Sequence, residues 1–88
     1  MNKYYSSHVV WKRIDENQAV RYLCFYDLIS KKYAVQNAEF FYVPVSKERL
    51  FEADTNALEL FIDIDPAERC DWFEELLDAI KNHELDFS

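Results

Sequence analysis

Residues 4–28 read YYSSHVVWKRIDENQAVRYLCFYDL. This stretch is rich in β-branched and aromatic residues, contains no proline, and is interrupted only by the polar run Asp15-Glu16-Asn17. Such a composition is typical of two strands joined by a short loop. The sequence therefore predicts an N-terminal β-hairpin.

The loop also predicts the register of this hairpin. If Ile14 and Gln18 close a three-residue loop, every later cross-strand pair follows by counting outward. The expected pairs are Arg13 with Ala19, Trp11 with Arg21 and Val9 with Leu23 on one face, and Lys12 with Val20, Val10 with Tyr22 and His8 with Cys24 on the other. Both faces are apolar near the middle, so we expect the second face to be partly covered or used for contact.

A third strand is predicted over residues 33–43, after a turn at Ser30-Lys31-Lys32. Its alternation breaks at Gln36-Asn37, which indicates a bulge or a bend. Pro44 should end the strand, because proline cannot donate a backbone hydrogen bond.

The next segment begins with Ser46, a good N-cap, and favours a short helix over residues 47–54 that ends at Asn56. In residues 58–65, apolar and other side chains alternate with a period of two, which predicts a fourth strand. Helical spacing also runs through this region, so one long helix is the alternative.

The C-terminal region predicts a helix. Asp65-Pro66-Ala67-Glu68 and Asp71-Trp72-Phe73-Glu74 both have the form of a capping box, and an apolar stripe follows as far as Ile80. The helix should end near His83. The fold class is therefore α+β in a single domain, residues 1–88: a small antiparallel sheet of three to four strands with one or two helices on one face, in the order ββ(β)αβα.

The chain of 88 residues contains no glycine, whereas average usage of roughly 7% predicts about six. Phosphate-binding loops and dinucleotide fingerprints need glycine where the backbone takes a positive φ or lies against a phosphate. Those sites are excluded. Asn17 and Asn56 are the residues expected at positive φ in place of glycine.

Charge is distributed unevenly along the chain. Residues 1–44 carry six basic and four acidic side chains, a net of +2, and residues 45–88 carry four basic and thirteen acidic ones, a net of −9, which gives the total of −7. Without a basic cluster, direct binding of nucleic acid is not expected. A basic protein is the more plausible partner.

The acidic side chains of the second half are the first candidate binding patch, which would steer a basic protein. The alternative is a solvated surface that only keeps the protein soluble. We name as candidates Glu59, Asp63, Asp65, Glu68, Asp71, Glu75 and Asp78. Asp63 and Asp65 would share a strand face with Glu59, but no calcium-loop spacing accompanies them, so no metal is expected.

Cys24 would lie opposite His8 in the hairpin, the arrangement of a nucleophile and its base. No third orienting group or oxyanion site accompanies the pair, and a cysteine in the middle of a strand is more often a small buried residue. Cys24 and Cys70 are 46 positions apart and are expected to be reduced thiols. The sequence predicts no catalytic residue and no cofactor.

Aromatic residues make up 17% of the chain and suggest a second candidate surface, on the hairpin. Trp11 opposite Arg21 is a plausible cation–π pair, and aromatic and arginine side chains dominate interface hot spots. The alternative is that one face is core and the other is ordinary surface. The candidates are Trp11, Arg21 and Phe25 on one face and Tyr22 and Tyr26 on the reverse. If both faces are covered, a second copy of the sheet is the simplest cover.

These features favour a small acidic protein-binding module that docks on a larger, basic partner and inhibits or adapts it. Antitoxins, immunity proteins and nuclease inhibitors share this profile of size and charge. The alternative is a homodimeric structural or regulatory subunit that uses the aromatic face, and an enzyme has the least support. The N-terminus lacks the apolar stretch of a signal peptide, so we expect a cytoplasmic protein that does not enter a membrane.

Overall fold

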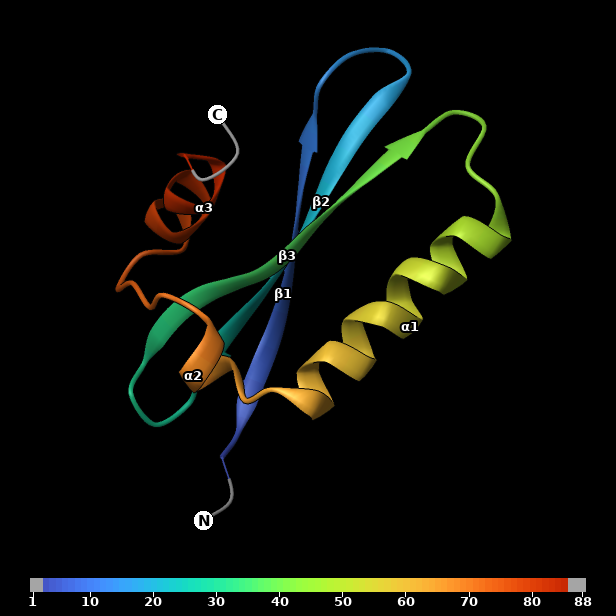
Figure 1. Ribbon diagram of the computed structural model, residues 1–88. Coiled ribbons are helices and arrows are strands. Elements are labelled where there is room, and N and C mark those ends of the chain that lie inside the picture. Colours follow the sequence, from blue (N-terminus) through green and yellow to red (C-terminus); the bar gives the residue numbers. More distant parts are fainter. Residues whose placement is uncertain (1–2, 86–88) are drawn as a thin grey trace.

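The computed structural model describes residues 3–85. Three antiparallel strands come first, β1 (Tyr5–Arg13), β2 (Gln18–Asp27) and β3 (Lys32–Tyr42), and they form one sheet in the order β1-β2-β3. Helices occupy the rest of the chain (Figure 1). The predicted α+β class and the N-terminal hairpin are confirmed.

The register of the hairpin is the predicted one. Ile14 N–H donates to the carbonyl of Gln18 over 3.0 Å, and all six expected cross-strand pairs are present. Within the loop, the Asp15 carboxylate accepts the backbone N–H of Asn17 at 2.7 Å. The expectation of a positive φ at Asn17 is wrong, because among residues 3–85 only Lys31, with φ of 61°, takes that conformation.

The irregularity predicted in the third strand is a β-bulge. Leu23 pairs with Asn37 and Cys24 pairs with Val35, so Gln36 is the extra residue of β3. Its side chain is buried, and its Nε2 donates to the carbonyl of Ala57 at 3.0 Å. The bulge thus aims a hydrogen-bonding side chain at the first helix.

That helix, α1 (Lys47–Asp63), is much longer than predicted. Ser46 is its N-cap as expected, accepting the N–H of Arg49 at 3.1 Å. The helix continues through Asn56, which therefore neither ends it nor takes a positive φ. The fourth strand predicted over residues 58–65 is wrong and the long-helix alternative is correct.

Two further helices follow, α2 (Pro66–Arg69), capped by Asp65 as predicted, and α3 (Leu76–Leu85). The second capping box does not begin a helix. Instead, the backbone of Phe73 exchanges two hydrogen bonds of 2.6 and 2.8 Å with Tyr33 at the edge of β3. This pairing holds the chain extended there, so α3 begins later than expected, and it ends at Leu85 rather than near His83.

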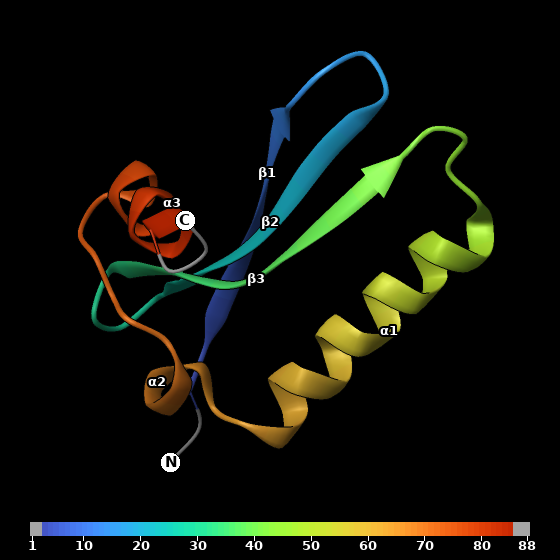
Figure 2. The same cartoon turned by 45° about the horizontal axis from the view of Figure 1, so that its top comes forward.

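Helices lie on both faces of the sheet, not on one, as Figures 1 and 2 show. We call these the α3 face and the α1 face. On the α3 face, α3 contributes Ile80 to a core that otherwise comes from β2, namely Val20, Tyr22 and Cys24. On the α1 face, the rings of Phe25 and Phe61 are 4.8 Å apart between centroids. None of the helices between residues 3 and 85 has the length and apolar character that crossing a membrane would require.

Candidate protein-binding surface

The sheet separates the aromatic candidates into two groups. Trp11, Arg21 and Phe25 belong to the α1 face, and Tyr22 and Tyr26 belong to the α3 face, as the register requires. Tyr22 is a core residue there, 5% exposed. The five residues therefore do not form one surface, and of the five only Trp11, on the α1 face, is exposed.

The predicted cation–π pair between Trp11 and Arg21 is replaced by a different one. The guanidinium of Arg21 lies 5.2 Å from the ring centroid of Phe41, and that of Arg49 lies 5.0 Å from the same ring. Arg21 also donates to Asp54 on α1 at 2.8 Å. Phe41 was not singled out from the sequence because the bulge in β3 decides which face it occupies.

Only part of the α1 face is covered. α1 approaches the sheet through Ala53 and Ala57, both buried, and it packs over β2 and β3. On β1, Val9 is 51% exposed and Trp11 is 58% exposed, although both point to this face. The partial cover expected for the second face of the hairpin is therefore present, and an exposed apolar area remains on β1.

Two cavities mark the uncovered part, one at each end of α1. A cavity of about 370 Å³ is lined by Val9 and Leu58 among others, and one of about 420 Å³ is lined by Trp11 and Leu50 among others. The ion pair between Arg21 and Asp54 borders the first of them. Both cavities are lined by residues of β1, β2 and α1.

The outer side of α1 extends this apolar area. Phe51, Leu58 and Ile62 are 73%, 60% and 72% exposed. At 3.6 residues per turn they lie roughly 140–180° around the helix axis from Ala53. We call the combined area the docking surface and define it as Val9, Trp11, Leu50, Phe51, Leu58 and Ile62.

Five of these residues, Val9 and the four on α1, were not among the candidates proposed from the sequence. The available signal was that both a strand period and a helix period fit residues 58–65. A helix that carries apolar residues on two opposite sides produces that double pattern, and it is expected where a helix is buried between two layers.

The acidic candidates occupy different environments. Asp65 caps α2 by accepting the N–H of Ala67, and its carboxylate also accepts bonds from the Tyr5 hydroxyl at 2.7 Å and the Lys3 ammonium at 2.9 Å. These hydrogen bonds, that from Ala67 first, lower the pKa of Asp65 to about 2. Burial and the bond to Asp65 raise the pKa of Tyr5. Asp65 is therefore a structural residue.

The other six acidic candidates are exposed, and within residues 3–85 none of them forms an ion pair. They are spread along consecutive elements, from the C-terminal half of α1 through α2 to α3. They therefore do not form one compact patch. Asp63 and Asp65 do not share a strand face, because Asp63 is helical. We call this set the acidic flank: Glu59, Asp63, Glu68, Asp71, Glu75 and Asp78.

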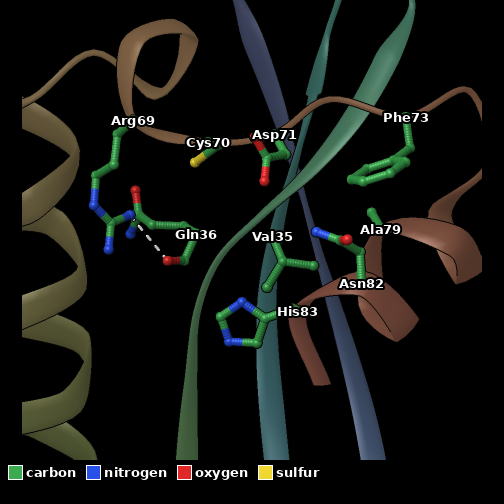
Figure 3. Close-up of a pocket in the computed structure, with 9 residues that line it drawn as sticks. All are labelled: Val35, Gln36, Arg69, Cys70, Asp71, Phe73, Ala79, Asn82 and His83. Atoms are coloured by element: carbon green, nitrogen blue, oxygen red, sulfur yellow. Dashed lines mark hydrogen bonds between the residues drawn. The ribbon is translucent and has the colours of Figure 1, made fainter. Parts of the chain in front are cut away.

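A polar cavity of about 190 Å³ lies between β3, the 70–73 segment and α3 (Figure 3). Arg69 closes one end by donating to the carbonyl of Gln36 at 2.9 Å. Figure 3 shows Cys70 and His83 at separate ends, with Val35 between them. Burial raises the pKa of the Cys70 thiol, whereas a cysteine nucleophile needs a lowered pKa. The cavity therefore lacks an activated thiol.

Cys24 and His8 are opposite each other as predicted, but they do not form a nucleophile and base. Cys24 is completely buried, and burial raises its pKa to about 11. The His8 ring instead contacts the Ser6 hydroxyl at 3.3 Å and the rings of Tyr26 and Tyr33. Both cysteines are free thiols.

The described part of the chain, residues 3–85, contains no group of three or more His, Cys, Asp or Glu side chains that could hold a metal ion. No family model, no curated protein and no solved structure matches this chain.

Proposed function

We propose that this chain is a small acidic protein-binding module with two contact surfaces. The docking surface is the observation that carries the proposal. Trp11, Phe51 and Ile62 each expose more than half of their side chains on one side of the molecule. A large exposed apolar area is typical of a site where another protein binds, because water contact with it is unfavourable.

The composition of the docking surface supports the same conclusion. Trp11 lies with its ring 5.9 Å from that of Phe41, which is itself held between Arg21 and Arg49. A tryptophan supported in this way keeps its position before a partner arrives, and rigid aromatic residues are common hot spots.

The acidic flank supports a basic partner at the second surface. Its six exposed carboxylates and the net charge of −7 would attract a basic protein and raise the rate of association. The module would inhibit or adapt such a partner by covering the surface that the partner uses for an acidic ligand. The proposal includes no catalytic step.

Capture from an extract of the native cell tests the acidic flank. We expect a stoichiometric basic protein that is released as salt rises from about 0.1 M to about 1 M, because the Debye length falls from roughly 10 Å to roughly 3 Å. Glu68→Lys combined with Asp78→Lys should reduce the recovery. The matched control, Glu16→Lys with Glu52→Lys, changes the net charge equally outside the flank, and an equal loss in both variants would refute a role for the flank.

A further inference from the structure

The chain carries two apolar surfaces that it cannot cover itself. One is the β1 side of the α1 face, with Val9 and Trp11, and the other is the outer side of α1, with Phe51, Leu58 and Ile62. α1 is already fixed over β2 and β3 by the contact of Gln36 with Ala57 and the ion pair of Arg21 with Asp54. On β1 it reaches Tyr5 through Phe61, and it leaves Val9 and Trp11 exposed.

The shape of the molecule agrees with a missing layer. Its extents are 42 × 25 × 19 Å, and its accessible surface is 6409 Å². A compact monomer of 10.6 kDa exposes roughly 5,500 Å², so the chain exposes about 900 Å² more than expected. This excess is close to the ~800 Å² that each partner contributes to a protein–protein interface of standard size.

The charges of the two surfaces are complementary. α1 carries two basic and five acidic residues, a net of −3, whereas β1 carries no acidic residue. Of its two basic residues, Lys12 points to the α3 face and pairs with Glu84. Arg13, at the end of β1, is exposed and points to the α1 face. An α1 laid on the β1 of another copy would thus bring opposite charges together.

We propose that the docking surface binds a second copy of this chain, in an isologous dimer in which α1 of each copy covers β1 of the other. The inference rests on the proposed function, because it names the occupant of the docking surface. A two-fold axis parallel to the strands produces this arrangement: the two α1 helices lie side by side between two sheets. Two residues of the acidic flank, Glu59 and Asp63, lie on α1 and so belong to this layer, whereas the other four follow α1 in the chain.

The arrangement predicts a particular pair of contacts. A rotation about an axis along the strands keeps each residue at its height, and Val9 and Leu58 line the same cavity of one chain. Val9 of one protomer therefore meets Leu58 of the partner subunit, and the same contact occurs a second time across the axis.

The molar mass measured by analytical ultracentrifugation tests the proposal. We expect the purified wild-type chain to approach twice 10.6 kDa as its concentration rises. Val9→Lys and Leu58→Glu should each weaken the dimer by about tenfold or more. Both side chains are at least half exposed, so each variant should keep the circular dichroism spectrum of the folded chain.

Leu77→Glu is the matched control. Leu77 is a helical leucine of nearly the same exposure as Leu58, 58% against 60%, but it lies on α3, away from the docking surface. This variant should dimerise like the wild type. An equal loss in Leu77→Glu and Leu58→Glu would overturn the proposed interface.

Mixing the two variants distinguishes this dimer from other dimers. In a mixed dimer of Val9→Lys with Leu58→Glu, the introduced lysine meets the introduced glutamate, and the second contact is that of the wild type. The mixture should therefore dimerise although each variant alone is monomeric. A mixture that stays monomeric would contradict the isologous contact.

If the wild-type chain is monomeric at all concentrations, the proposal that a second copy binds the docking surface is wrong. The proposed function then stands if Val9→Lys and Leu58→Glu abolish the capture of another protein while Leu77→Glu does not. If those variants capture the same proteins as the wild type, the docking surface has no binding role and that part of the proposed function also fails.

Discussion

Arg21 and Asp54 join the middle strand of the sheet to α1, with 2.8 Å between Nη1 and Oδ1. The two ends of this ion pair differ in exposure: the Arg21 side chain is 11% exposed and the Asp54 side chain is 59% exposed. The guanidinium of Arg21 also lies over the ring of Phe41. The ring and the packing of the arginine stem should therefore contribute more than the carboxylate.

Removing Arg21 should cost much more stability than removing its ionic partner. We expect Arg21→Ala to lower the free energy of unfolding by about 1–3 kcal/mol, through the lost cation–π contact and the lost packing. Asp54→Asn should cost less than about 1 kcal/mol, because exposed ion pairs contribute little. Urea unfolding measures both, with the exposed Lys81→Ala as control, and equal losses for the two variants would contradict this interpretation.

The buried side chain of Gln36 should stabilise α1 on the sheet. Gln36→Ala removes its bond to the Ala57 carbonyl and should cost about 1–3 kcal/mol. For a domain of this size each kcal/mol lowers Tm by roughly 4–8 °C. Gln18→Ala is the control, since its bond to the Tyr42 hydroxyl is exposed. We expect a much smaller fall in Tm for that variant, and the reverse order would refute the role of the bulge.

Asp65 should make stability depend on pH in the acid range. Its folded pKa of about 2 lies below the ordinary value of 3.8, so it contributes stability that is fully present above the ordinary value and is lost as pH falls toward the folded value. Asp65→Asn keeps a capping oxygen but no titrating group. We expect urea unfolding of this variant to depend less on pH between about 4 and about 2 than that of wild type. Asp63→Asn, on the exposed side of α1, should follow the wild type.

The two cysteines should react slowly in the folded chain. Burial raises the pKa of Cys24 to about 11, from an ordinary value of 9.0, and it also raises that of Cys70. Only a thiolate reacts with a disulfide reagent. At neutral pH we expect Cys70→Ser, which leaves Cys24, to be labelled more slowly than Cys24→Ser, and denaturant should accelerate both. Labelling of native Cys24 at the denatured rate would show that the site opens readily.

Local signals in the sequence predict the three N-terminal strands, the register of the hairpin and the bulge. Asp15-Glu16-Asn17 determined the hairpin register, the break at Gln36-Asn37 indicated the bulge, and Ser46 and Asp65 were found as N-caps. Each of these features depends on a few residues close together in the chain, which is why composition and spacing could predict it.

Residues 58–65 are predicted wrongly because the fully buried positions of α1 are alanines and not large apolar residues. Ala53 and Ala57 are buried, whereas Leu58 and Ile62 face outward. A pattern that equates large apolar residues with burial therefore selects the wrong side. The docking surface could not be predicted for the same reason. Which side of α1 is exposed depends on how the helix is placed on the sheet and not on its local sequence.

The second capping box failed for a tertiary reason. The backbone of Phe73 forms two hydrogen bonds with Tyr33 at the free edge of β3, and this pairing keeps the segment extended. A strand at the edge of a sheet has unpaired N–H and C=O groups, with which another segment of backbone can pair. This pairing outweighed the helical preference of residues 71–75, and nothing within that segment reports the position of a strand some forty residues earlier.

The bulge at Gln36 also shifts the phase of side-chain alternation along β3 by half a period. If Gln36 were an ordinary strand residue, strict alternation from Tyr33 would point Phe41 toward α3. Because Gln36 is the extra residue of the bulge, the ring points toward α1, where both arginines contact it. An in-frame loss of the Gln36 codon would remove the bulge and leave residues 37–42 on their present faces, but it would also remove the buried hydrogen bond to the carbonyl of Ala57. Alignments of this strand by hydropathy alone must therefore leave one position unmatched.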